Sequence, residues 1–167
     1  MGHKDHKEKA KNSVKCFIIT VSDSRTPDTD ESGKFISDIL KINGHNVIGY
    51  VILKDEPNLV CEFARNESLE VDVEAIIING GTGISSRDST FEAVDAILEK
   101  RLTGFGELFR YLSYIEIGSS AIMSRACAGV LNKKIIISLP GSESAVKLAM
   151  NKLILPELSH MIWEVNR

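Results

Sequence analysis

A glycine-rich stretch that follows an apolar run is the part of this sequence best suited to chemistry. Three glycines lie between positions 80 and 83. Glycines let a backbone turn sharply and leave its amide groups open to a phosphate. Ser89 and Glu92 have the spacing of a capping box, which predicts a helix that begins at Thr90. Because the free N–H groups and the dipole of a helix N-terminus favour anions, the stretch predicts an anion-binding loop.

An acidic residue stands at the end of this loop. Asp88 would repel a bound anion unless a cation lay between them, and Asp55 follows another predicted strand. Mg²⁺ prefers oxygen ligands, usually one or two carboxylates together with phosphates and water. Each aspartate alone fits a turn or helix-cap residue slightly better. Together they favour a magnesium-bound nucleotide.

Two other phosphate-binding motifs are excluded. Residues 80–90 contain no Gly-Lys-Ser/Thr, so the loop is not a Walker A motif. A dinucleotide motif that began at Gly81 would need a glycine where Ser86 stands.

Apolar runs alternate with helical patterns along the rest of the chain. The predicted strands are 14–21, 47–53, 75–78 and 134–139, and the predicted helices are 33–43, one from Pro57, one from Thr90, a face over 105–115, a short helix within 119–130 and a closing helix interrupted around Pro156. This rhythm predicts one doubly wound α/β domain over 14–167, with a mostly parallel sheet and helices on both faces. The Lys-rich residues 1–13 are expected to form a flexible arm.

Ligands of such a domain gather at the carboxyl ends of its strands. Four polar or glycine-bearing loops are therefore expected to converge there: 22–25, 54–57, 80–88 and 140–142. Arg125 could add a bidentate phosphate contact, although a surface ion pair is the more common role for such a residue. The turn at 140–142 could place helix amides on an anion, or simply join a strand to a helix.

Composition narrows the classes of partner. The chain has 167 residues, a formal net charge of −3 and a pI near 5.8, so charge gives no case for binding nucleic acid. No apolar run approaches the roughly 18–20 residues that cross a bilayer, so no membrane is expected. Three widely spaced cysteines, an odd number, indicate free thiols in a reducing compartment, and a charged N-terminus argues against export. We expect a cytoplasmic protein.

Six ordered motifs resemble the MoaB/MogA family of molybdenum cofactor biosynthesis proteins. The resemblance covers about residues 14–163, and the segment from Phe105 to Ser120 is closer to MoaB. The motifs are Thr20-Val21-Ser22-Asp23-Ser24-Arg25, Gly80-Gly81-Thr82-Gly83, Asp88-Ser89-Thr90-Phe91-Glu92-Ala93, Gly104-Phe105-Gly106-Glu107, Ser124-Arg125-Ala126 and Pro140-Gly141-Ser142.

The resemblance implies a MogA-like fold that binds molybdopterin. Active members use Mg-ATP to adenylylate the pterin's terminal phosphate, release pyrophosphate, and pass the product to a metal-insertion protein. They assemble as trimers or hexamers, and the apolar segment from Phe105 to Ile115 is a candidate interface. By motif, Asp55 and Asp88 become the catalytic residues and the Mg²⁺ ligands. The implied substrate-binding residues are Ser22, Gly80, Gly81, Thr82, Gly83, Thr90, Ser119, Ser120, Arg125, Pro140, Gly141 and Ser142.

Some members of the family lack the acidic residues and are inactive. This chain keeps both, which favours an active adenylyltransferase. Two alternatives stay open: a non-catalytic molybdopterin-binding or carrier protein, and a different nucleotide-dependent enzyme on the same scaffold.

Overall fold

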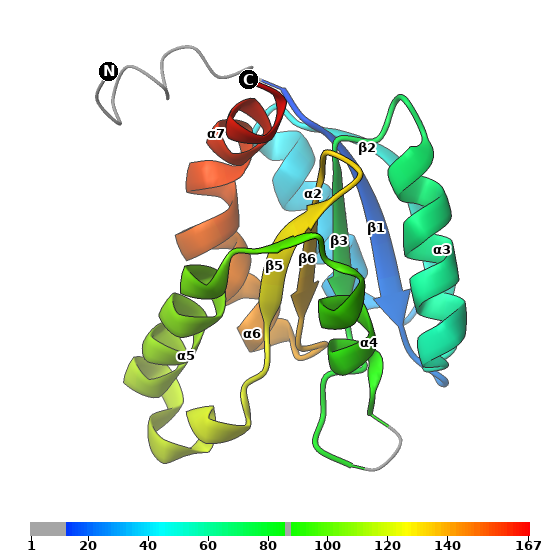
Figure 1. Ribbon diagram of the computed structural model, residues 1–167. Helices are drawn as coiled ribbons and strands as arrows, with labels where there is room; N and C mark the ends of the chain where they lie inside the picture. The colour runs from blue at the N-terminus through cyan, green and yellow to red at the C-terminus, as the bar shows by residue number, and fades with distance from the viewer. Residues whose placement is uncertain (1–12, 86–87) are drawn as a thin grey trace.

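A six-stranded mixed sheet forms the centre of the computed structural model, which describes residues 13–85 and 88–167 (Figure 1). The strand order is β2-β1-β3-β6-β5-β4. The first four of these strands run parallel, while β5 pairs antiparallel with β6 and β4 antiparallel with β5. The elements are β1 (Lys15–Val21), α2 (Glu31–Ile42), β2 (Asn46–Leu53), α3 (Pro57–Leu69), β3 (Ala75–Asn79), α4 (Thr90–Ile97), β4 (Lys100–Arg101), α5 (Thr103–Ile117), the 3₁₀ helix η1 (Gly118–Met123), β5 (Cys127–Leu131), β6 (Lys134–Leu139), α6 (Glu143–Ala149), the π-helix η2 (Met150–Ile154) and α7 (Leu155–Asn166).

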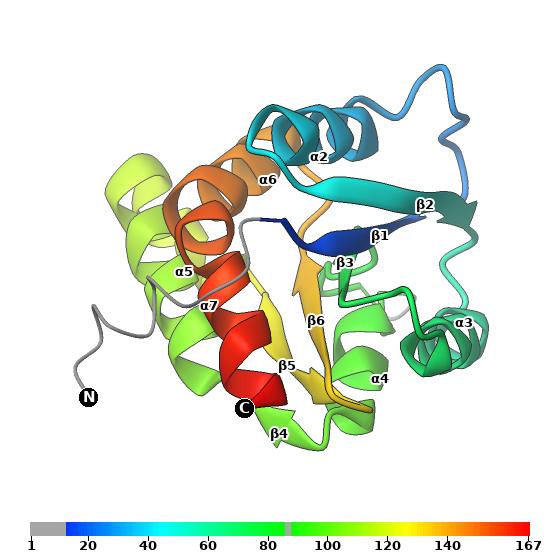
Figure 2. The ribbon, with the colours of Figure 1, turned by 90° about the horizontal axis from the view of Figure 1, so that it is seen from above.

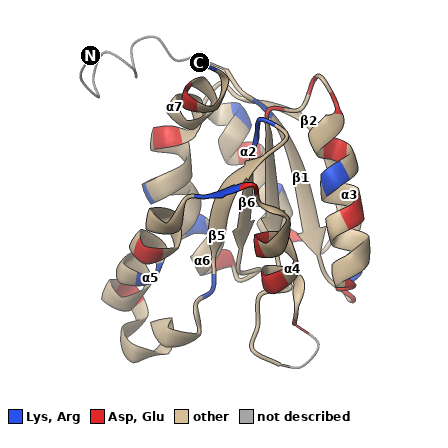
Figure 3. Ribbon diagram, in the orientation of Figure 1, with Lys and Arg blue, Asp and Glu red and all other residues tan. Residues whose placement is uncertain are grey.

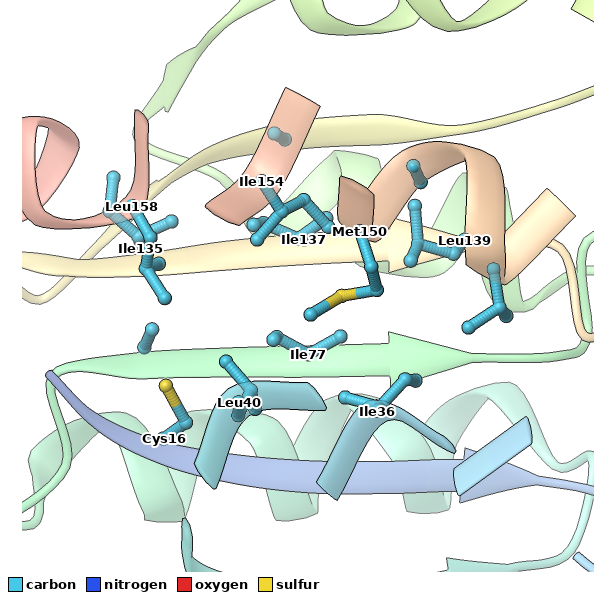
Figure 4. Packing of buried hydrophobic residues seen from close by; sticks show 14 of the residues in the cluster. Cys16, Ile36, Leu40, Ile77, Ile135, Ile137, Leu139, Met150, Ile154 and Leu158 are labelled. Atoms are coloured by element: carbon cyan, nitrogen blue, oxygen red, sulfur yellow. The ribbon is translucent and has the colours of Figure 1, made fainter. Parts of the chain in front are cut away.

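The middle of the sheet is buried on both faces. Every residue of β3 is buried, as expected for an apolar run in a parallel sheet covered on both sides. Ile77 packs in one core cluster with Leu40 of α2 and Met150 of η2 (Figure 4). Ile76 belongs to a second cluster, which includes Val60 of α3 and Val94 of α4.

Helices cover both faces, as Figure 2 shows. The helices α2, α5, α6 and α7 contribute to the first cluster, whereas α3 and α4 contribute to the second. The predicted doubly wound α/β domain is therefore confirmed.

The chain reverses its winding direction at β1, which lies between β2 and β3. The connection through α2 covers one face of the sheet and the connection through α3 covers the other. Loops that leave neighbouring strands toward opposite faces open a crevice between them, and in α/β sheets this crevice is the usual ligand site. The topology thus places the candidate site at the ends of β1 and β3.

The predicted short helix within 119–130 is present only as the 3₁₀ helix η1, and the remainder of the segment is not helical. The chain forms the short η1 and then the strand β5, which a two-residue turn joins to β6. Both turn residues have positive φ, +49° at Asn132 and +62° at Lys133, as hairpin turns of this length require. A five-residue apolar run does not distinguish strand from helix, and β4, which has two residues, was not predicted.

The predicted capping box at α4 is also wrong, although the helix does begin at Thr90. Ser89 occupies the cap position without a side-chain hydrogen bond, and Glu92 pairs instead with Arg125. A guanidinium offers Glu92 a full positive charge, whereas the capping box offers a single backbone N–H, so the pair with Arg125 is favoured.

The closing helix is interrupted as predicted, and the interruption is the π-helical turn η2. Pro156 lies in the first turn of α7, directly after η2. Proline cannot donate a backbone hydrogen bond to the preceding turn, and the wider turn accommodates this. The predicted arm 1–13 lies outside the described residues except for Ser13.

Helix length and the placement of charged residues bear on the partners expected from the sequence. None of the described helices is both long and apolar enough to cross a bilayer. Acidic and basic residues are interspersed over the helices in Figure 3, whereas nucleic-acid interfaces gather basic residues on one face.

Candidate functional site

Loops from four parallel strands meet at the carboxyl edge of the sheet. The backbone N–H of Ser22, after β1, donates to the carbonyl of Leu53 at the end of β2 (2.8 Å). Arg25 Nη2 donates to the carbonyl of Gly141, after β6 (2.9 Å). A Cβ on Gly141 would lie 3.1 Å from the Cα of Gly80, after β3. The predicted convergence of these loops is confirmed.

A cavity of about 450 Å³ opens between the loops after β1, β3 and β6 and the end of η1, a volume within the range of small-molecule sites. Its walls combine glycine backbone, hydroxyl groups and one guanidinium with the apolar residues Val21, Met123 and Pro140. The lining residues are Val21, Ser22, Ser24, Arg25, Gly80, Gly81, Thr82, Gly83, Met123, Ser124, Pro140 and Gly141.

Two glycines of the loop cannot be replaced by larger residues without strain. Gly80 has φ +106°, and a Cβ there would lie 2.2 Å from the carbonyl oxygen of Val21. Gly81 has φ +64°, and its Cβ would lie 2.8 Å from Asp55 Oδ1. Residues with a Cβ rarely adopt positive φ, so this backbone shape requires glycine and leaves peptide groups open to the cavity.

Asp55 lies behind the glycine loop, on the side of α4. Its Oδ1 accepts a hydrogen bond from Thr90 Oγ1 (2.8 Å), and its backbone N–H donates to Asp23 Oδ1 (3.2 Å). Within the described part of the chain, Oδ2 of Asp55 has no hydrogen-bond partner. The side chain is thus held by one oxygen and keeps the other available.

Asp88 closes the far end of the same loop. Its Oδ2 accepts hydrogen bonds from the backbone N–H (3.2 Å) and the hydroxyl (2.5 Å) of Ser85. A Cβ on Gly83 would lie 2.5 Å from this oxygen, so the carboxylate folds back against the loop. Asp88 and Asp55 therefore flank one loop from its two ends.

The donor set of this loop fits Mg²⁺ only in part. Asp55 and Asp88 each offer a carboxylate oxygen, which suits the ion's preference. The described residues contain no cluster of three or more His, Cys, Asp or Glu side chains that could enclose a metal. A Mg²⁺ ion at this loop would therefore take its remaining ligands from phosphate and water, as it commonly does.

Arg125 binds the loop itself instead of lining the cavity. Its Nε donates to the carbonyl of Thr82 (2.9 Å), and Nη2 donates to the carbonyls of Gly83 and Asp88, the latter at 3.2 Å. The guanidinium also lies over the ring of Phe91, 4.9 Å from its centroid. Arg125 therefore holds the glycine loop and forms the ion pair expected of such a residue, with Glu92, while the phosphate contact stays a prediction.

A buried carboxylate lies beneath the cavity. Asp30 is 1 % exposed and accepts hydrogen bonds from Thr20 Oγ1 (2.5 Å), Tyr50 Oη (2.5 Å), the Gly33 N–H (3.0 Å) and Arg25 Nη1 (3.1 Å). Burial by itself raises the pKa of Asp30, but the hydrogen bonds and the charge of Arg25 together lower this pKa below its usual value. Burial and the bond to Asp30 raise the pKa of Tyr50 to about 12, so this hydroxyl remains a donor at neutral pH.

The residues proposed from the sequence divide into three groups. Ser22, Gly80, Gly81, Thr82, Gly83, Pro140 and Gly141 line the cavity. Asp55, Asp88, Thr90 and Arg125 contact or clamp the loop from behind. Ser119, Ser120 and Ser142 are not among the lining residues; the first two are exposed on η1, and Ser142 caps α6.

Sequence reasoning missed Arg25 and Asp30 as site residues. Arg25 lay in a loop already assigned to the site, and its charge was the available signal. Asp30 carried no such signal, because its partner Tyr50 lies twenty positions away on another strand.

Comparisons with known proteins place this chain in a family. Residues 17–160 match a family described as "Probable molybdopterin binding domain". Molybdenum cofactor biosynthesis protein B of Bacillus cereus is 49% identical over 164 residues, covering 98% of this chain and 97% of the relative. A crystal structure of a molybdenum cofactor biosynthesis protein B superposes with a TM-score of 0.92 at 49% identity, covering 95% of this chain and 99% of the other. The tungsten cofactor synthesizing protein MoaB of Pyrococcus furiosus has a TM-score of 0.82 at 33% identity, with coverage of 95% and 100%.

Proposed function

The chain belongs to the molybdopterin-binding family of molybdenum cofactor biosynthesis proteins, and we propose that it is a Mg-ATP-dependent molybdopterin adenylyltransferase. One observation carries the proposal beyond family membership. The cavity is lined by hydroxyls, glycine backbone and Arg25, and two carboxylates flank its glycine loop. Such a site suits two phosphate-bearing substrates and a divalent cation.

The reaction joins the two phosphates directly. An oxygen of the pterin's terminal phosphate attacks the α-phosphorus of ATP and forms a new P–O bond. The bond from the α-phosphorus to the bridging oxygen breaks, and the electron pair leaves with pyrophosphate. No covalent enzyme intermediate is needed, so the protein's task is to position the groups and stabilise charge.

The residues of this chain divide that task. The hydroxyls of Ser22, Ser24 and Thr82 and the backbone at 80–83 receive phosphate oxygens in the cavity. Asp55 and Asp88 would hold Mg²⁺, which offsets the negative charge that builds on the phosphates. Arg125 keeps the loop in the shape that both tasks require.

We expect purified protein with molybdopterin, Mg²⁺ and ATP to yield adenylyl-molybdopterin and pyrophosphate in equal amounts. Product would be followed by chromatography and phosphate release, beside an active homologue as a positive control. Omission of Mg²⁺ should abolish turnover, because the ion offsets the phosphate charge.

The other outcomes identify other functions. Molybdopterin binding without ATP turnover would replace the proposal with a binding or carrier role. Tight ATP binding without affinity for molybdopterin would indicate a different nucleotide-dependent enzyme.

We also propose that the protein works in the cytoplasm as a homotrimer or hexamer and passes its product to a metal-insertion protein. Its three cysteines are free thiols, which suits a reducing compartment. Large apolar side chains are exposed on the consecutive elements α5 and η1, and a concentration of exposed apolar side chains suits an interface. They are Leu108, Tyr111, Tyr114, Ile115, Ile117, Ile122 and Met123.

A charge placed on this surface should dissociate the oligomer. Ile115, on α5, is 62% exposed, and we expect Ile115→Lys to lower the mass measured by light scattering from that of a trimer or hexamer to that of a monomer. Val71→Lys is the control, since Val71 is 91% exposed and lies outside α5 and η1. A parent protein that is monomeric at micromolar concentration would contradict the assembly.

A further inference from the structure

We infer that Arg25 is the cation that binds a substrate phosphate in the cavity, and that Asp30 is the positioning residue that aims it. The identity of the phosphate, on ATP or on the pterin, rests on the proposed function. The contact itself rests on the geometry of the site.

The guanidinium of Arg25 has N–H donors that its contacts with described residues do not use. A guanidinium carries five N–H donors, and within the described part of the chain Arg25 uses one for Asp30 and one for Gly141. Its side chain is 30% exposed and lines the cavity. Three donors therefore remain for a ligand, in the fork geometry that matches phosphate.

No other described residue that lines the cavity is charged. The hydroxyls of Ser22, Ser24, Thr82 and Ser124 can share a phosphate's oxygens but cannot offset its charge. Arg125, the nearby alternative, already donates to three loop carbonyls and pairs with a carboxylate. Arg25 is thus the group that favours an anion over a neutral ligand.

Asp30 fixes the direction of this guanidinium. Its Oδ1 holds Arg25 and also accepts the N–H of Gly33, while its Oδ2 is held by Thr20 and Tyr50. The carboxylate accepts hydrogen bonds from residues of two strands and of the first turn of a helix. It therefore keeps its position when Arg25 binds a ligand. Donors held in this way bind at a lower entropic cost than a free side chain.

The same network reaches the turns on either side of Arg25. The carbonyl of Gly141 accepts from both Arg25 Nη2 and Ser32 Oγ (2.9 Å each). Thr20, which donates to Asp30, accepts from Asn79 Nδ2 (2.9 Å), and Asn79 directly precedes the glycine loop. One buried carboxylate therefore sets the positions of the cation and of the two turns that border it.

Replacement of Asp30 by Asn separates positioning from charge. Asn leaves Arg25 and Gly33 only a neutral amide oxygen, which holds a guanidinium more weakly than a carboxylate does, and it turns its amide toward the hydroxyls of Thr20 and Tyr50, which then accept. The change removes one negative charge next to the cavity. If charge alone governed affinity, Asp30→Asn would bind phosphates more tightly. If the orientation of the Arg25 guanidinium governs affinity, the variant binds them more weakly.

The experiment measures equilibrium dissociation constants by calorimetry for ATP, molybdopterin and adenosine, without turnover. We expect Arg25→Ala to weaken binding of at least one phosphorylated ligand by roughly 10- to 100-fold, the effect of losing a charge-assisted hydrogen bond, and to leave adenosine unchanged. The ligand that is affected identifies the source of the phosphate. Arg25→Lys should weaken binding of that ligand by about tenfold, because an ammonium group is a point charge without the fork of donors. Asp30→Asn should weaken it by at least threefold, because the guanidinium of Arg25 is then less firmly oriented toward the phosphate.

Controls separate this role from a structural one. Arg101→Lys alters an Arg–Asp pair outside the cavity and should leave every constant unchanged. Thermal unfolding confirms that each variant is folded at the assay temperature, and Arg25→Lys decides the question if Arg25→Ala does not fold. A purely structural Asp30 would lower the unfolding temperature of Asp30→Asn and leave the constants of the folded variant unchanged.

The outcomes keep the inference distinct from the proposed function. Parent-like affinity of the Arg25 variants for ATP and molybdopterin overturns the assignment of Arg25, even in an active enzyme. Parent-like or tighter binding by Asp30→Asn overturns the positioning role. Binding that weakens as expected in a protein without adenylylation activity supports the inference while the proposed function fails, and a parent that binds neither ligand overturns both.

Discussion

Replacement of Asp55 or Asp88 by Asn is expected to lower kcat/KM for molybdopterin adenylylation by roughly 10²- to 10³-fold. Removal of one group that stabilises transition-state charge commonly costs that much, about 2.7–4 kcal/mol. Asn keeps an acceptor for the Thr90 hydroxyl at Asp55 and for Ser85 at Asp88. The loss would therefore reflect the missing charge and metal ligand, and it should appear in kcat while molybdopterin affinity stays within a few-fold of the parent.

Glu56→Gln is the matched control for these variants. Glu56 is an exposed carboxylate next to Asp55, and it caps α3 without a side-chain hydrogen bond. It should keep parent activity, as shown by product chromatography at several Mg²⁺ concentrations. Full activity in both Asn variants would contradict a catalytic metal held by these carboxylates and would leave them only the role of supporting the loop. The double variant tests whether the two act together, since residues that act as one unit give losses that do not add.

Local patterns predicted the scaffold because each depends on neighbouring residues. The apolar run before Gly80 became a fully buried strand, and Thr90 begins α4 as expected. The order of strands and helices then determined which loops meet, since parallel strands bring their carboxyl ends to one edge. The glycine loop could be located in this way before any side-chain contact was known.

Side-chain direction could not be predicted in the same way. For Arg125 the sequence suggested a surface ion pair or a phosphate contact, but it did not suggest the hydrogen bonds to three carbonyls of the folded loop. Arg125, which directly precedes the segment that enters β5, reaches that loop only after β3 and β5 have both paired with β6. The capping box predicted for Glu92 does not form for the same reason, because its partner Arg125 lies 33 positions away in the sequence. Charged groups take the strongest partner that the fold brings within reach, and sequence spacing does not reveal it.

Replacement of Gly80 by Ala should have the second large effect, on stability as well as binding. An L-residue at a left-handed φ costs about 1–2 kcal/mol, and the new Cβ would lie 2.2 Å from the carbonyl of Val21. The carbonyl belongs to a buried strand and cannot move aside freely, so relief of the clash costs about 1–3 kcal/mol more. We expect a loss of about 3 kcal/mol in the free energy of unfolding, or roughly 6–12 °C in Tm for a chain of this size.

Gly104→Ala provides the opposite expectation within the same protein. Gly104 lies in the first turn of α5, and a Cβ there would meet nothing within 4 Å. Alanine in a helix is about 0.5–1 kcal/mol more favourable than glycine, so this variant should melt slightly above the parent in calorimetry. Because both changes add one methyl group, a difference in sign between them isolates backbone conformation and close approach as the cause. Equal Tm values for Gly80→Ala and the parent would mean that the loop relaxes without cost, and the close backbone approach at the cavity would then no longer explain why glycine occupies position 80.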